Sequence, residues 1–151
     1  MTILDDHPTS ISGALDALVR DVLIDQACPE RVEVCVHTVD AEIIRRHNAD
    51  AFGKDEPTDV VSFPLEVLVP GAAPTVDPAG PPLVLGDVFV APDVVAERAA
   101  RLGFDLDAEM ALMTVHGVLH LLGYDHVTDD EAETMEAIET RILAKHGMTR
   151  R

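Results

Sequence analysis

Three histidines within one short run, HGVLHLLGYDH from His116 to His126, constrain this chain more than any other feature. On a helix, His116 and His120 are four positions apart, so both imidazoles project from one face, with their Cβ atoms about 5–6 Å apart. Gly123 can adopt a positive φ without a Cβ clash, and a sharp turn there brings His126 back toward the same point. Three converging imidazoles suit a borderline-soft divalent ion, most often Zn²⁺. We therefore expect one zinc ion at the end of a helix.

The sequence predicts only three protein ligands for this ion, which indicates a catalytic site and not a structural one. The two cysteines, Cys28 and Cys35, lie far upstream and do not complete a four-ligand structural site. Three protein ligands with an open fourth position are typical of catalytic zinc, which lowers the pKa of bound water to about 7 and polarises carbonyl or phosphoryl oxygens. The alternative is that these are core or surface histidines of a buried helix, but their offsets around a glycine favour the metal site.

Hydropathy patterning predicts one α+β domain over residues 1–151. It contains a small mixed sheet of three or four strands, packed with about five helices. The strands are expected near residues 2–4, 31–39, 58–66 and 83–91. The helices are expected from a cap at Ser10 or Ser12 to Pro29, from about residue 40, and over 92–103, 107–122 and 128–147. The proline-rich segment 69–82 reads as a surface loop.

The charge balance is strongly acidic. Asp and Glu number 28 against 11 Lys and Arg, for a formal charge of −17. Conventional nucleic-acid binders take their affinity from many cations that neutralise phosphates, so this class is excluded. This does not exclude nucleic acid as a substrate that a metal or a partner positions. The N-terminus is not a signal peptide and no apolar run is long enough to span a membrane, so we expect a cytoplasmic protein with no membrane or DNA partner.

The spacing HxxxHxxGxxH is also used by metzincin proteases, which place a glutamate directly after the first histidine as general base. Gly117 occupies that position here and cannot accept a proton. A metalloprotease is therefore a weak alternative.

The histidine run, TDVVSFP at residues 58–64 and LGDVFVAP at residues 85–92 together resemble the YbeY family of bacterial metal-dependent endoribonucleases. The three blocks occur in the family's order. The resemblance implies a zinc held by His116, His120 and His126, and a role in ribosomal RNA maturation and ribosome quality control. It also implies work in the cytoplasm, in contact with proteins of the small ribosomal subunit.

One position departs from the family pattern. Members often carry an arginine, thought to handle the scissile phosphate, where this chain has Phe52. Loss of such a donor can cost about 10²–10³ in rate. Lys54 is our candidate to replace this arginine, with Arg45 or Arg46 as alternatives. A lysine ammonium is a point charge, however, and cannot bind a phosphate with two parallel hydrogen bonds as a guanidinium does. Phe52 also favours a second hypothesis, a noncatalytic assembly factor in which zinc stabilises a surface that docks on the ribosome.

Other polar residues are candidates for the same site. Asp87 interrupts an apolar strand, and we predict that it either bonds the second nitrogen of a ligand histidine or caps a helix or faces water. Lys54 and Asp87 are thus the candidate catalytic residues. Thr58, Asp59 and Ser62 could line the cleft, and Asp125 is expected to brace the turn before His126.

Overall fold

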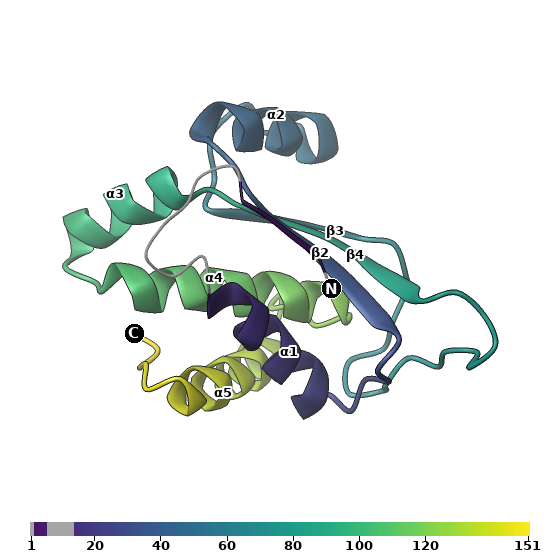
Figure 1. Cartoon of the computed structure of the whole chain (residues 1–151). Coiled ribbons are helices and arrows are strands. Elements are labelled where there is room, and N and C mark those ends of the chain that lie inside the picture. The colour runs from purple at the N-terminus through teal and green to yellow at the C-terminus, as the bar shows by residue number, and fades with distance from the viewer. Residues whose placement is uncertain (1, 6–13) are drawn as a thin grey trace.

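The computed structural model describes residues 2–5 and 14–151, in which strands and helices form a sheet with helices on both faces (Figure 1). In these residues the strands are β1 (Thr2–Asp5), β2 (Val32–Thr38), β3 (Val60–Pro64) and β4 (Leu83–Val90). The helices are α1 (Leu15–Asp25), α2 (Ala41–Phe52), α3 (Pro92–Leu102), α4 (Leu106–Leu121) and α5 (Asp129–Lys145). The predicted α+β fold is confirmed: we expected three or four strands and about five helices, and the described residues form four strands and five helices.

The sheet is mixed, as expected, with the strand order β1-β2-β4-β3. β1, β2 and β4 run parallel, and β3 pairs antiparallel with β4. In β2 the alternating residues Val32, Val34 and Val36 are buried, which places one face of the strand on the core. β4 lies inside the sheet and buries Leu85 and Val88, as its apolar sequence predicts.

α4 is the central helix of the core. It packs against β3 and β4 on one side and against α1 and α5 on the other, whereas α2 lies on the opposite face of the sheet (Figure 1). From Glu109 to Leu122 every residue is buried except His116 and His120. These two positions are therefore where the buried helix opens toward solvent.

Local signals set the helix ends as predicted. Thr128 caps α5, its hydroxyl oxygen accepting from the Glu131 N–H at 3.2 Å, and Gly103 ends α3 with a φ of 73°. The predicted caps Ser10 and Ser12 fall outside the described residues. Residues 69–82 form neither helix nor strand, as expected. Within the described part of the chain, no helix combines the length and apolarity needed to cross a bilayer.

Candidate metal centre

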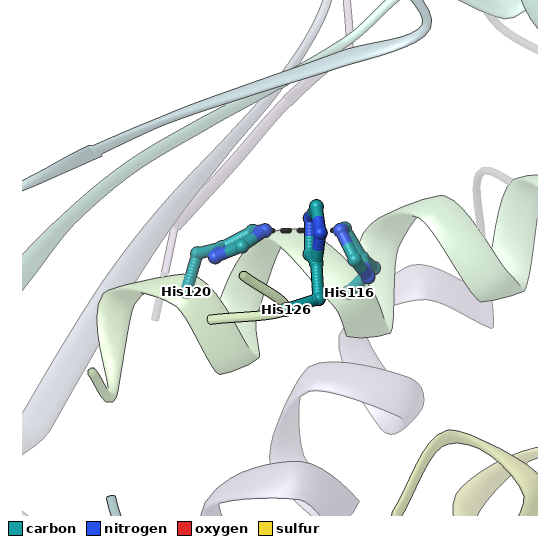
Figure 2. Close-up of side chains that lie close together, drawn as sticks. All are labelled: His116, His120 and His126. Atoms are coloured by element: carbon teal, nitrogen blue, oxygen red, sulfur yellow. Dashed lines mark hydrogen bonds between the residues drawn. The ribbon is translucent and has the colours of Figure 1, made fainter. Parts of the chain in front are cut away.

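The structure brings the three histidines of the run together at the end of α4 (Figure 2). One nitrogen from each of His116, His120 and His126 lies within 4.8 Å of the others. The Nε2 atoms of His116 and His120 face each other at 2.9 Å. Zn–N bonds are about 2.0–2.1 Å long, so a single ion can reach all three nitrogens after small side-chain rotations.

The turn after α4 directs His126 toward the two helical imidazoles. Gly123 has a φ of 96°, and a Cβ added there would lie 2.1 Å from the carbonyl oxygen of Leu68. Only glycine combines this conformation with so close an approach. Beyond it, the Asp125 carboxylate accepts from the His126 N–H at 2.8 Å. Asp125 therefore braces the turn, as predicted.

Acceptors hold the second ring nitrogens of His116 and His120. The Nδ1–H of His116 donates to Glu139 Oε2, and the Nδ1–H of His120 donates to the Tyr124 carbonyl oxygen, both at 2.8 Å. A carboxylate and a carbonyl can only accept, so Nδ1 of each ring carries a proton and Nε2 is the nitrogen that faces the metal site. This is how proteins orient imidazole ligands toward a metal. The residues present therefore fit a divalent ion.

Burial supports the same protonation state. It lowers the pKa of His120 below its usual value, and repulsion between the protonated forms of His120 and His116 lowers it further. The neutral imidazole is consequently favoured near pH 7. Neutral imidazole is also the form that binds a metal.

Two clefts flank the histidines. The first, which we call the arginine cleft, has a volume of about 350 Å³ and is lined by His116 and His126 together with Arg98, Arg150 and Arg151. The second, which we call the phenylalanine cleft, has a volume of about 420 Å³. Its lining includes His120, Phe52, Thr58, Ser62 and Tyr124. The histidines thus lie between the arginine cleft, whose lining is charged, and the phenylalanine cleft, whose lining is largely uncharged.

A comparison with protein families matches residues 4–147 of this chain to the family described as Endoribonuclease YbeY. The chain belongs to the YbeY family. An Endoribonuclease YbeY from Halalkalibacterium halodurans is 37% identical over 150 residues, covering 96% of this chain and 94% of that protein. Another from Geobacillus thermodenitrificans is 43% identical over 136 residues, covering 90% and 86%. The resemblance inferred from the sequence is confirmed.

A solved structure supports the fold. The solution structure of TM1509 from Thermotoga maritima superposes with a TM-score of 0.65 and covers 97% of this chain and 92% of its own. Its sequence identity is 23%, so this likeness speaks for the fold alone.

Gly117 shows why this YbeY-family chain lacks the protease glutamate. A Cβ at Gly117 would lie 2.5 Å from Val88 Cγ1 and 3.1 Å from Ser62 Oγ. The Ser62 hydroxyl donates to the Gly117 carbonyl oxygen at 2.9 Å. α4 therefore sits directly on β3 and β4 at this point, and the backbone leaves no room for a glutamate side chain.

Two of the sequence-predicted residues lie elsewhere than expected. The prediction that Asp87 bonds a ligand histidine is wrong for His116 and His120: Asp87 Oδ1 bonds His37 Nε2 at 2.9 Å, because the pairing of β2 with β4 places these two residues near each other. Lys54 follows α2 and is exposed, and it lines neither of the two clefts beside the histidines. Thr58 and Ser62 do line the phenylalanine cleft, and Asp59 lines the arginine cleft.

Sequence reasoning missed the residues that support the site from outside the histidine run. Glu139 lies on the buried stripe of α5 between Ile138 and Ile142, and an acidic residue on an apolar face is the signal that could have revealed it. No motif in the sequence singles out Arg150 and Arg151. The structure instead pairs them with the buried carboxylates of Glu139 and Glu109.

Proposed function

We propose that this chain is a zinc-dependent endoribonuclease that cleaves single-stranded segments of ribosomal RNA during maturation and quality control of the ribosome. The observation that carries the proposal is the convergence of three imidazoles, two of which, His116 and His120, have their Nδ1–H groups fixed by acceptors. Membership of a family whose relatives are named endoribonucleases supports the substrate class. The described residues add no fourth side chain to the histidine group, which leaves room for a substrate oxygen.

Each residue has a distinct part in this mechanism. His116, His120 and His126 would hold the ion, which when bound supplies Lewis-acid polarisation of the phosphoryl group and activation of water. Glu139 and the Tyr124 carbonyl keep the first two imidazoles oriented. The two clefts would each receive one of the RNA segments that flank the scissile bond.

The charge distribution makes the RNA contact dependent on other components. With a net charge of −17, the chain repels free RNA, and Arg98, Arg150 and Arg151 in the arginine cleft are already paired with carboxylates. We propose that small-subunit proteins or magnesium bound to ribosomal RNA supply the remaining attraction in the cytoplasm. Tight, nonspecific RNA binding at physiological salt would contradict this.

Lys54 and Asp87 enter the proposal as residues to be tested. Lys54 lies two positions beyond Phe52, which lines the phenylalanine cleft, so its ammonium could contact a phosphate of bound RNA. Asp87 is paired with His37, and any effect on the reaction would be carried by that pair. Lys54→Ala is expected to raise KM for RNA, and Asp87→Asn tests whether the pair matters.

The decisive experiment is cleavage of a structured ribosomal RNA fragment by the purified protein, with His116→Ala as control. Cleavage that disappears in the control supports the endoribonuclease. Cleavage that survives in the control points to a contaminating nuclease and refutes it. Metal analysis of the native chain and of His126→Ala gives the ion: about one zinc per chain is expected in the first, by analogy with other three-histidine sites, and much less in the second.

A noncatalytic assembly factor is the second candidate. Phe52, 57% exposed where the family often has arginine, favours it because no arginine is among the described residues that line the phenylalanine cleft. In that case zinc binds, RNA is not cut, and the protein still associates with the small subunit. The metalloprotease alternative fails because Gly117 has no space for the required glutamate.

A further inference from the structure

We propose that Arg150 is a positioning residue of the metal centre, which fixes Glu139 so that Glu139 fixes His116. The inference rests on the proposed zinc site and extends it beyond the histidine run. It gives the segment that follows α5 a part in metal binding.

The carboxylate of Glu139 is bound at both oxygens. Oε2 accepts from the Nδ1–H of His116 at 2.8 Å, and Oε1 accepts from the Nε–H of Arg150 at 3.1 Å. Its side chain is 2% exposed. With one directed partner on each oxygen, the carboxylate cannot rotate about its last bond without losing a hydrogen bond. Arg150 therefore sets the plane of the group that orients His116.

Because the carboxylate of Glu139 is buried, its pairing with Arg150 matters for stability and orientation. A buried carboxylate without a cationic or hydrogen-bonding partner is costly, and Arg150 is the cation paired with Glu139 in the described structure. The Arg150 side chain is itself only 23% exposed, so the pair is weakly screened by solvent.

The segment carrying Arg150 is anchored on both sides. Before it, Gly147 takes a φ of 70°, and the Met148 N–H donates to the Leu143 carbonyl oxygen at 3.0 Å, which turns the chain back from α5. After it, the Nε–H of Arg151 donates to Glu109 at the start of α4, at 2.9 Å, and its guanidinium lies 5.1 Å from the centre of the Phe104 ring. Figure 1 shows the C-terminal end beside the start of α4.

The two arginines thus bind two buried carboxylates on the same wall. Glu109 also accepts from Arg98 at 3.0 Å, and Arg98 is paired with Asp59. Because Glu109 has Arg98 as well, loss of Arg151 leaves that carboxylate paired, whereas loss of Arg150 leaves Glu139 without its cation. Zinc affinity should therefore fall more in Arg150→Ala than in Arg151→Ala.

The test compares zinc affinity in Arg150→Ala, Arg150→Lys and Arg151→Ala, with Arg141→Ala as matched control. Arg141 is also an arginine paired with a carboxylate, Asp25, but it lies outside both clefts. Affinity is measured by competition with a chromophoric chelator. Loss of a group that orients a metal ligand typically weakens affinity by about 10–100-fold. We expect about tenfold for Arg150→Ala, partial recovery in Arg150→Lys, and less than about twofold for the control.

A second readout needs no metal. Long-range ¹H–¹⁵N correlation spectra of the metal-free protein report which ring nitrogen of His116 carries the proton, with the signal assigned by its absence in His116→Ala. The native spectrum should show Nδ1–H, and Arg150→Ala should shift this signal or mix the two tautomers. Urea unfolding of each variant at pH 7 shows that it remains folded.

The outcomes are distinct. If Arg150→Ala lowers only the free energy of unfolding, with zinc affinity and the His116 signal both unchanged, Arg150 only stabilises the fold and the proposal is overturned. If the native chain binds no zinc, the proposed function fails, and the His116 signal alone still decides the role of Arg150. RNA cleavage enters neither measurement.

Discussion

Replacing Gly117 by alanine should destabilise the fold, although alanine is the better helix former. The added Cβ would lie 2.5 Å from Val88 Cγ1, 3.1 Å from Ser62 Oγ and 3.2 Å from Val60 Cγ2. Carbon atoms in ordinary contact are about 3.5–4.0 Å apart, so the overlap with Val88 is about 1 Å. α4 or β4 must move to accommodate it.

The expected cost follows from these contacts. Overpacking of a dense core costs about 1–3 kcal/mol, and three short contacts at Gly117 place this substitution near the upper end of the range. The gain in helix propensity from glycine to alanine offsets about 1 kcal/mol. The net loss is therefore about 2 kcal/mol, a fall of about 4–8 °C in Tm for a chain of this size.

A double-mutant cycle tests the cause of the loss. Urea unfolding of the metal-free protein, followed by far-UV circular dichroism, is compared for Gly117→Ala, Val88→Ala and the double variant. Val88 is fully buried, so its truncation alone should cost about 2–3 kcal/mol. Because it also removes the clashing methyl group, the double variant should lose about 2 kcal/mol less than the sum of the single losses. Additive losses, or native stability in Gly117→Ala, would refute the steric explanation.

Three further measurements probe the site and the fold. Zinc at about 100 times its Kd should raise the free energy of unfolding by about 2.7 kcal/mol, and His126→Ala should lose most of this gain in thermal unfolding; an equal gain in both would contradict the three-histidine site. Phe52→Arg should raise kcat/KM on RNA by about tenfold or more, since it adds a guanidinium to the phenylalanine cleft, and an unchanged rate would show that this position does not meet the phosphate. Asp25 has a pKa lowered chiefly by its hydrogen bond from Arg141, so its contribution to stability is present above its ordinary pKa and is lost as the pH falls through the lowered value. Urea unfolding at pH 5 and at about pH 2.5 should show a larger loss in the native chain than in Asp25→Asn, and parallel losses would contradict this sign.

Local sequence was sufficient wherever the determining interaction is local. The spacing of His116, His120 and His126 and the position of Gly123 were enough to predict their convergence, because a helical turn and a positive φ are properties of short segments. The same holds for the cap at Thr128. The fold class followed from hydropathy periods that the burial of each strand and helix now explains.

Partners chosen by tertiary packing could not be predicted in this way. Asp87 was expected beside a ligand histidine, but the register of β2 against β4 places it near His37. Glu139 meets His116 only because α5 packs on α4. Arg150 reaches Glu139 because the chain turns back at Gly147, and no pattern in the sequence fixes where such a turn ends.

The short span of the histidine run has a consequence for how the site is assembled. All three imidazoles belong to α4 and its exit turn, whereas the carboxylate and guanidinium that orient His116 belong to residues later in the chain. A fragment that ends before α5 would therefore keep all three candidate ligands but lack the groups that orient His116, so the two contributions to the site are separable along the chain.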